Sequence, residues 1–469
     1  MKIEHQLVDS IVATDFGQLS KGVIDATKKS IIDTLAAMIA GRKAEGLEAI
    51  VRLVKKWAGK REATVLSYGF KVPSPNAVFV NGVMARAMDI DEVHDIGTVH
   101  PSATIIPASL GAAEAVGSVS GKEFIVANAL GIDLICRMSL SPAVGCSISG
   151  MNFSFQCGSF GSCTAAGKLM KLNRAQMLNA LGIAYSQASG NSQCYIDGSH
   201  TIRVQQGLSA KAGIVSALLA QIGITGAENF FEGKFGYFTI YQGGKFDREI
   251  LSKDLGKYFE GIHVSQKPLY SCCKYTHASV DAARAIVSEN KITPNQISQV
   301  NAIVTSQEVF NLVCDPMEIK RKPRTLVDAQ FSLPYTIALA LVKGKVTLDD
   351  FTNEAIQDNE VLKMAQKVQV ELKPCEGRAV LPAPGIIEVQ TVGGEQYKKE
   401  VNFVKGHPRN PNSLEDCMEK MRACIEYSEC KNIRNNFQQI SDLLFDLENV
   451  GDIRKIINLL SPPMGRSSF

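Results

Sequence analysis

The sequence predicts a mainly α-helical protein, built from a large discontinuous helical domain and a smaller α+β lid domain. Apolar residues recur at helical spacing through the first half of the chain, and alternation typical of strands begins only after about residue 264. Helical spacing returns after about residue 405. Because 469 residues exceed one ordinary core, we expect a helical domain over residues 1–263, the α+β lid domain over 264–404, and C-terminal helices over 405–469 that return to the helical domain.

Two kinds of helix are expected in the first half. Residues 20–40 place Val23, Ile31, Leu35 and Met38 mostly on one face, and Gly41 is a suitable C-terminal stop. The later segments 158–169, 174–190 and 209–223 are rich in Ala, Gly and Ser. Small residues all around a helix allow close backbone approach, which indicates central helices buried on every side.

The segment after residue 264 mixes strands and helices. Val300, Ala302 and Val304 alternate with polar neighbours, and residues 385–401 predict a hairpin that turns at Gly393 and Gly394. Residues 331–342 and 353–365 are expected to be helical. After residue 405 the predicted helices are 414–427 and 440–447.

Composition and charge exclude several functional classes. Hydrophobic residues make up 45% and charged residues 21%, as in globular proteins, and the net charge is +3. This balance argues against nucleic-acid binding, which needs a basic surplus on one face. The first residues do not form a secretory signal, and no apolar run approaches the roughly 18–20 residues of a membrane span. We therefore expect a cytoplasmic protein that does not span a membrane. The twelve cysteines show no CxxC spacing, which argues against a zinc site.

A dense polar cluster follows the predicted helix that ends near residue 88. It contains Asp89, Asp91, His94 and His100, and it precedes an apolar helix for which Ser102 is a suitable N-cap. One interpretation is a solvated acidic turn. A second is a histidine, oriented by an aspartate, that acts as general acid or base beside a bound carboxylate. A metal site is a third, although the spacing matches no metal motif.

A second cluster lies where the helical pattern gives way to the α+β region. Lys267, Lys274 and His277 fall within eleven residues, together with paired cysteines at 272 and 273. Domain junctions commonly hold ligand clefts, and lysine with histidine suits recognition of an anion and proton transfer to or from it. The simpler alternative is two surface lysines and a helix cap.

A third candidate is Arg203, which leads into one of the predicted buried helices. It is either a structural arginine held by a salt bridge or a clamp that binds a carboxylate through two hydrogen bonds.

Taken together, these segments resemble the MmgE/PrpD family over nearly the whole chain. The order and spacing of six short segments carry the resemblance: Asn81-Gly82; Asp89-Ile90-Asp91-Glu92 with His100-Pro101-Ser102; Phe231-Glu232-Gly233-Lys234-Phe235-Gly236; Lys267 with Cys272-Cys273 and Thr276-His277; Ala329-Gln330-Phe331-Ser332-Leu333-Pro334; and Lys405-Gly406-His407-Pro408. The family includes 2-methylcitrate dehydratase, cis-aconitate decarboxylase and iminodisuccinate epimerase. The resemblance implies a helical domain with an α+β lid, a homodimer, no metal or organic cofactor, and an active site lined by Asp89, His100 and His277.

The chain departs from the family pattern in three places. Ile202 stands where the family often has a lysine, and Arg203, one position on, can replace the charge of that lysine but not its position. A His-Pro pair that often follows a glycine near Gly150 is missing. The loop from Asp89 to His100 is one residue longer than in the decarboxylase. These departures disfavour cis-aconitate decarboxylation.

The resulting hypothesis is a cofactor-free lyase that acts next to a carboxylate of a small di- or tricarboxylic acid, in the manner of 2-methylcitrate dehydratase. One of His100 and His277 would remove a proton, and the other, helped by Asp89, would protonate the leaving hydroxyl. The expected substrate-binding residues are Arg203, Lys267, Lys274, His94 and Asp91. Epimerisation and decarboxylation of the same substrate class are alternatives. Two further alternatives are a metal-dependent hydrolase that uses the loop from Asp89 to His100, and a helical scaffold with its lysines scattered on the surface.

Overall fold

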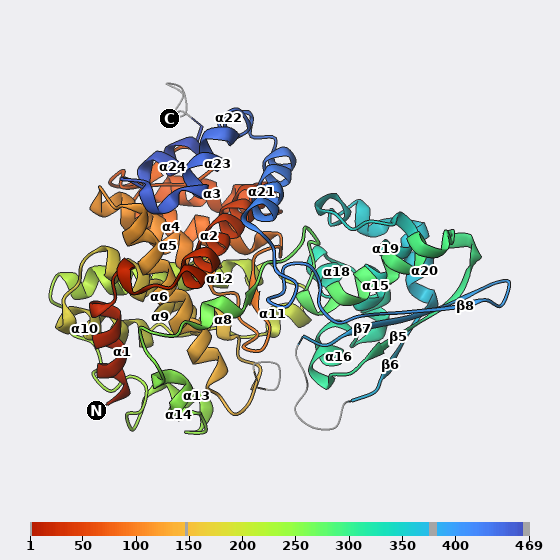
Figure 1. Cartoon of the computed structure of the whole chain (residues 1–469), viewed down its shortest axis with the longest axis horizontal. Coiled ribbons are helices and arrows are strands. Elements are labelled where there is room, and N and C mark those ends of the chain that lie inside the picture. The colour runs from red at the N-terminus through yellow and green to blue at the C-terminus, as the bar shows by residue number, and fades with distance from the viewer. Residues whose placement is uncertain (1, 146–148, 375–381, 463–469) are drawn as a thin grey trace.

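Two hydrophobic cores organise the chain. The computed structural model describes residues 2–145, 149–374 and 382–462. One core joins side chains between residues 3 and 264 with side chains between 417 and 460, and the other is formed chiefly by side chains between residues 270 and 389. Figure 1 shows these two parts side by side, the larger made of helices and the smaller of helices on a sheet. We call them the helical body and the α+β body.

The helical body is built from helices of very different length. The predicted helix over residues 20–40 is α2, and the predicted helix over residues 158–169 is α9. Up to residue 263 its α-helices are α1 (Ile3–Ala13), α2 (Lys21–Gly41), α3 (Leu47–Trp57), α4 (Ser74–Ala87), α5 (Ser102–Val116), α6 (Gly121–Leu140), α8 (Phe153–Gln156), α9 (Gly158–Leu169), α10 (Arg174–Tyr185), α11 (Gln193–Ile196), α12 (Thr201–Gln221), α13 (Tyr237–Gln242) and α14 (Arg248–Ser252).

Small residues let the central helices α4, α5, α9 and α12 pack closely, as their composition predicts. At the crossing of α4 and α12, a Cβ atom added to Gly82 would lie 2.9 Å from the Cα of Gly207. A Cβ on Gly207 would lie 2.4 Å from the carbonyl oxygen of Phe79. Glycine is therefore required at both positions, because the two backbones touch. Helix α12 begins at Thr201 rather than at the expected residue 209, since Gly207 serves this contact and does not break the helix.

The α+β body contains a four-stranded sheet of order β6-β5-β7-β8. Strand β5 (Ile297–Val304) runs parallel to β6 (Val368–Leu372) and antiparallel to β7 (Gly385–Thr391), and β7 continues into β8 (Gln396–Val401). This confirms the predicted hairpin. The main helices are α15 (Lys274–Asn290), α19 (Leu333–Lys343) and α20 (Asn359–Lys367), and the shorter ones are α16 (Gln307–Val313), α17 (Met317–Arg321) and α18 (Leu326–Gln330).

We expected the first domain to be all-helical, but it also contains strands. It contains two short sheets, β1 (Ala63–Thr64) with β2 (Lys71–Val72), and β3 (Val93–His94) with β4 (Val264–Ser265). Strands of two residues are too short to produce a periodic pattern in the sequence. The pairing of β3 with β4 matters for the site, because it joins the loop from Asp89 to His100 to the segment that leads to Lys267.

The C-terminal helices α21 (Leu414–Ser428), α22 (Lys431–Asn435), α23 (Phe437–Phe445) and α24 (Arg454–Leu459) contribute to the core of the helical body. Helix α21 packs against α2, and its Lys420 is buried between three separate segments. The Nζ atom of Lys420 donates to Asp33 Oδ1 at 2.6 Å, to the carbonyl oxygen of Ile90 at 2.5 Å and to that of Lys267 at 2.8 Å. One ammonium group thus ties the C-terminal part of the chain to both predicted polar clusters.

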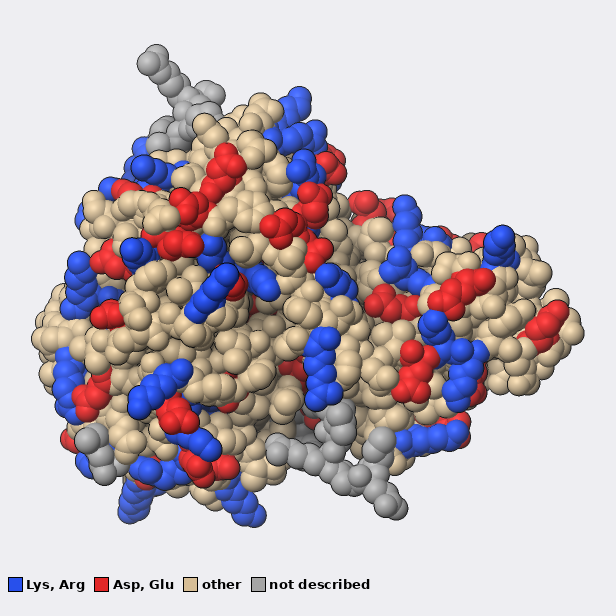
Figure 2. Space-filling model, in the orientation of Figure 1, with Lys and Arg blue, Asp and Glu red and all other residues tan. Residues whose placement is uncertain are grey.

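Charged side chains of both signs are interspersed over the face seen in Figure 2, in keeping with the small net charge. Among the described residues, no helix is long and apolar enough to cross a lipid bilayer.

Replacing Lys420 tests this link. We expect Lys420→Met to lower the free energy of unfolding by about 3–5 kcal/mol, because Asp33 would stay buried without its cation. The double variant Lys420→Met, Asp33→Leu also removes the unpaired carboxylate and should recover most of the lost stability. Chemical denaturation measures both effects. The control is Lys363→Met, which breaks an exposed pair with Glu360 and should change stability little. A loss no larger than in this control would contradict the role of Lys420.

Candidate active site

The turn after α4 brings carboxylates into the interior. Helix α4 ends at Ala87, and Asp89 adopts φ 51°, a left-handed conformation that aspartate tolerates better than most residues. This reversal directs the chain inward, so that Asp89, Asp91 and Glu92 are all buried. The solvated acidic turn, one of the three interpretations of this segment, is therefore wrong. Ser102 does not act as the N-cap either: it is the first residue of α5, and its hydroxyl donates to Glu92.

Two cations compensate the buried carboxylates. Arg86 Nη1 lies 2.5 Å from Asp89 Oδ1 and 3.2 Å from Asp91 Oδ1. Lys267 Nζ lies 2.7 Å from Asp89 Oδ1 and also donates to the carbonyl oxygen of Asp89. Although burial opposes ionisation, Arg86 and Lys267 hold the pKa of Asp89 below its usual value. Asp89 is therefore an ionised carboxylate, and its second oxygen has no hydrogen-bond partner within the described structure.

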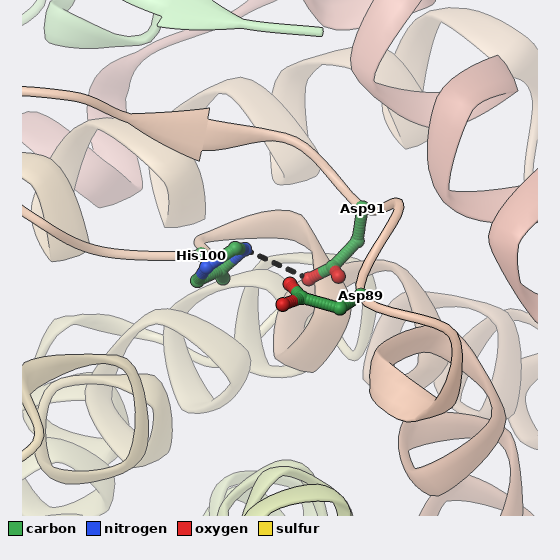
Figure 3. Close-up of side chains that lie close together, drawn as sticks. All are labelled: Asp89, Asp91 and His100. Carbon is green, nitrogen blue, oxygen red and sulfur yellow. Dashed lines mark ion pairs between the residues drawn. The ribbon is translucent and has the colours of Figure 1, made fainter. Parts of the chain in front are cut away.

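Asp91 and His100 form a carboxylate–imidazole pair. Nδ1 of His100 lies 3.0 Å from Oδ2 of Asp91, and the side chains of Asp89, Asp91 and His100 point toward one another (Figure 3). This contact is at ion-pair distance without hydrogen-bond alignment, and Nε2 is the ring nitrogen that Asp91 does not approach and that remains for proton transfer. Burial and the nearby Arg86 lower the pKa of His100, and Asp91 opposes this shift. The imidazole is therefore neutral near pH 7, which is the form a general base requires.

His100 opens onto a cavity of about 400 Å³ between the two bodies. Its walls are mixed, with carboxylates, amides and hydroxyls beside apolar side chains. The lining residues used below are Arg86, Asp89, Asp95, His100, Asn152, Ser154, Asn191, Gln193, Tyr195, Lys274, Tyr275, Glu308 and Asn311. The volume falls within the roughly 300–1,000 Å³ of small-molecule sites, so the cavity can hold a small organic acid.

Lys274 is the lining cation without a partner. Its side chain is buried at the start of α15, and its Nζ makes no hydrogen bond within the described residues. Burial lowers the pKa of Lys274, and the nearby carboxylate of Asp95 opposes this shift. Arg86, the other cation in the cavity wall, is already paired with Asp89 and Asp91. Lys274 is therefore the group best placed to bind a carboxylate of a ligand.

Three of the sequence-predicted residues lie outside this cavity. His277 is fully buried behind its wall, where Nε2 donates to the carbonyl oxygen of Cys272 at 2.9 Å. His94 is buried in β3, and its Nδ1 accepts from the backbone N–H of Gly97 at 3.0 Å. Arg203 lines a different cavity. Sequence spacing did not reveal these positions, because burial removes His277 and His94 from the cavity surface and Arg203 faces another cavity.

Lys267 and Asp91 act through other residues. Lys267 has no exposed side-chain surface and touches Asp89, and Asp91 touches His100 and Arg86. Neither residue lines the cavity. The structure therefore does not support the direct contact with substrate that we expected for them from the sequence. Lys267, Lys274 and His277 are all buried, so the surface distribution expected of a scaffold is not found.

Several lining residues escaped the sequence analysis. Arg86 lies inside an apolar helix, so its place in the sequence did not mark it as a site residue. Its spacing of three residues from Asp89 was the available signal. Asn152 donates to Tyr195 Oη at 2.6 Å, and Tyr275 Oη lies 3.2 Å from Thr98 Oγ1 and 3.3 Å from Glu308 Oε1. These contacts join segments far apart in the chain, so local sequence holds no signal for them.

The donor set does not fit a divalent metal ion, although Asp89, Asp91 and His100 offer ligand atoms within 4.8 Å of one another. Arg86 and Lys267 already occupy oxygens of the two carboxylates at hydrogen-bonding distance. A dication placed there would be repelled by both cations at short range. His94, the fourth ligand of the hydrolase alternative, does not belong to this group of ligand atoms.

Fold and site together define a mainly helical protein with an acid–base cavity between two bodies. Comparison with known proteins places it among its relatives: a model of the MmgE/PrpD N-terminal domain matches residues 5–249, and a model of the MmgE/PrpD C-terminal domain matches residues 270–444. The chain belongs to the MmgE/PrpD family.

Curated relatives are similar over almost their whole length. The cis-aconitate decarboxylase of Aspergillus terreus is 25% identical, over 97% of this chain and 94% of its own. The cis-aconitate decarboxylase of Homo sapiens is 26% identical, over 98% and 95%. The cis-aconitate decarboxylase-like protein oryM of Aspergillus oryzae is 24% identical, over 94% and 93%.

Replacing Lys267 and replacing Lys274 should have opposite effects on stability. Lys274→Met removes a desolvated charge that has no partner, so we expect the free energy of unfolding to rise by about 1–2 kcal/mol. Lys267→Met leaves Asp89 with one cation fewer and should lower it by about 3–5 kcal/mol. Denaturant titration at pH 7 measures both. Equal destabilisation by the two variants would show that Lys274 is paired in solution.

Proposed function

We propose that this protein is a lyase that acts at the carbon next to a carboxylate of a small di- or tricarboxylic acid. The observation that carries the proposal is the imidazole of His100, 3.0 Å from the carboxylate of Asp91, in the same cavity as Nζ of Lys274, which has no hydrogen-bond partner among the described residues. The names of the relatives support it, because cis-aconitate is a tricarboxylic acid and its decarboxylation is a lyase reaction.

Lys274 would bind the carboxylate next to the reacting carbon. A C–H bond beside a carboxylate is weakly acidic, and its removal leaves an enolate-like species with extra negative charge. A buried ammonium stabilises that charge more strongly than water does, because the local dielectric is low. The amides of Asn191 and Asn311, which also line the cavity, would form hydrogen bonds with the remaining polar groups of the substrate.

His100 would take the proton on Nε2, and the imidazolium formed would be stabilised by Asp91. Among the described residues that line the cavity, His100 is the only imidazole. The second histidine of the sequence hypothesis, His277, does not reach the cavity. We therefore assign both proton transfers to His100: Nε2 removes the proton, the C–O bond breaks, and Nε2–H returns the proton to the departing hydroxyl as water.

This scheme favours dehydration in the manner of 2-methylcitrate dehydratase. It requires the proton and the hydroxyl to leave from the same side of the substrate. The unpaired oxygen of Asp89 would accept a hydrogen bond from the substrate hydroxyl and hold it in place. Decarboxylation is the second candidate, because the relatives described above carry that name. Here a carboxylate would leave as carbon dioxide, and His100 in its protonated form would donate a proton to the carbanion.

Replacing the base tests the proposal. We expect His100→Gln to lower kcat by about 10²- to 10⁴-fold, the usual contribution of a positioned general base. The assay incubates the protein with citrate, 2-methylcitrate and cis-aconitate and follows water loss and carbon dioxide release separately. The matched control is His263→Gln, which changes an exposed histidine bonded to Tyr258 and should leave kcat unchanged. The proposal fails if the His100 variant retains nearly full turnover, or if no carboxylic acid is converted.

The pH profile provides an independent check. Because the pKa of His100 is lowered, the neutral base persists below the ordinary histidine value of about 6.5. We therefore expect the acidic limb of the kcat/KM profile to lie below that pH. Asp91→Asn removes the charge that raises this pKa, so the acidic limb should move to still lower pH while the plateau drops. An acidic limb at or above pH ~6.5 would exclude His100 as the base. An acidic limb that Asp91→Asn shifts to higher pH would exclude it as well.

A further inference from the structure

Arg203 is buried with most of its hydrogen-bonding capacity unused. It lies in the first turn of α12 with a relative exposure of 3%. Its guanidinium makes one hydrogen bond, from Nη1 to the carbonyl oxygen of Glu45 at 3.2 Å, and Nε has no partner among the described residues. A buried guanidinium N–H group without an acceptor is costly.

Another arginine of the helical body shows what a purely structural guanidinium looks like here. Arg137 is as deeply buried as Arg203. It donates to Asp133 at 2.8 Å and to the carbonyl oxygens of Ile250, Lys253 and Tyr258 at 2.8–2.9 Å. The salt-bridged interpretation of Arg203 is thus unsupported, because no carboxylate lies within ion-pair distance of it in the described part of the chain.

Arg203 lines a second cavity, of about 190 Å³, which is separate from the first. The turn after α4 contributes to both: Arg86 and Asp89 line the first cavity, and Ala87 and Met88 line the second. The other walls come from both bodies: Lys43, Ala44, Glu45 and Tyr427 from the helical body, and Leu326, Gln330, Phe351, Thr352, Asn353 and Glu354 from the segment between residues 326 and 354.

The other charged groups of this cavity do not neutralise Arg203. Lys43 pairs with Glu429 at 3.1 Å and lies over the ring of Tyr427. The carboxylate of Glu45 lies 3.2 Å from His200 and also attracts Arg203, although it makes no ion pair with Arg203 among the described residues. Glu354 is exposed, where solvent screens its charge. Arg203 therefore has no directly paired carboxylate among the described residues, and burial lowers its pKa to about 10, which leaves it protonated at pH 7.

We propose that the second cavity binds a small carboxylate through Arg203. With Nη1 held by Glu45, the edge formed by Nε and Nη2 is left for a ligand. The two N–H groups along that edge match the two oxygens of a carboxylate, which gives a bidentate pair. A single charge on the protein suits a singly charged group better than a phosphate dianion. The small volume excludes larger ligands such as nucleotide cofactors.

A ligand at this position would stabilise the contact between the two bodies next to the active site. It would touch α12 and the segment after α2 on one side and Phe351–Glu354 on the other. Met88, in the wall of the cavity, accepts a hydrogen bond from Ser271 and directly precedes Asp89. Binding in the second cavity is therefore coupled to the turn that positions the catalytic carboxylates, and it does not depend on which reaction the first cavity performs.

Thermal unfolding tests this proposal without an enzyme assay. Sodium acetate is titrated at constant ionic strength against the Lys274→Met protein, in which the free cation of the first cavity is missing. We expect a saturable rise in Tm, because a ligand that binds only the folded state stabilises it. The double variant Lys274→Met, Arg203→Lys keeps the charge but loses the planar edge of the guanidinium. It should bind acetate about tenfold or more weakly than Lys274→Met.

A second variant leaves Arg203 intact. Asn353→Trp places a large side chain at the exposed rim of the cavity and should abolish the response to acetate without lowering the Tm of the ligand-free protein. The proposal is overturned if acetate stabilises the Lys274→Met protein and its Arg203→Lys derivative equally, or if it stabilises neither. It is also overturned if inorganic phosphate binds more tightly than acetate, since the site would then not be built for a carboxylate.

Discussion

The burial of several carboxylates within one turn is the constraint on which the rest of this structure depends. Asp89, Asp91 and Glu92 follow one another closely and are all inside the protein. Burial raises the pKa of Glu92 to about 8, so the ionised groups of this turn are Asp89 and Asp91, whose pKa values are lowered by nearby cations. Buried charges are tolerated only when cations and hydrogen-bond donors reach them. Arg86 comes from the preceding helix, but Lys267 comes from a segment 178 residues further along the chain. The turn can therefore exist only when the segment that leads into the α+β body is in place.

The same constraint accounts for the position of the C-terminal helices. Lys420 satisfies Asp33 and also binds the carbonyl oxygens of Ile90 and Lys267, one from each polar segment. Helix α21 is thereby held against α2 by a contact that also fixes the backbone of the site. Stability and active-site geometry share this network, so a substitution in α21, far from the cavity in sequence, would act on both.

Against this network of paired charges, Lys274 and Arg203 are buried cations that line cavities and make no ion pair within the described parts of the chain. Each lies in the wall of a cavity, one on either side of the turn after α4. Proteins keep such costly groups where a ligand supplies the missing partner, and the loss of stability is the usual consequence of a binding function. Both inferences about ligands in this protein, the substrate carboxylate at Lys274 and the second carboxylate at Arg203, follow from this single physical argument.

The sequence by itself determined that the chain is mainly helical, the sheet hairpin and the family, because helical and strand periodicity and the order of short motifs are local properties. It also singled out Asp89, Asp91 and His100, which lie close together in the chain. The tertiary structure alone decided which charges are paired. In the sequence, Lys267, Lys274 and His277 are polar residues near the predicted junction, and Arg203 precedes a predicted helix. In the structure Lys267 compensates Asp89, Lys274 faces the cavity, His277 is bonded to a backbone carbonyl, and Arg203 lines a second cavity. Burial and partners arise from segments distant in sequence, so local pattern could not distinguish them.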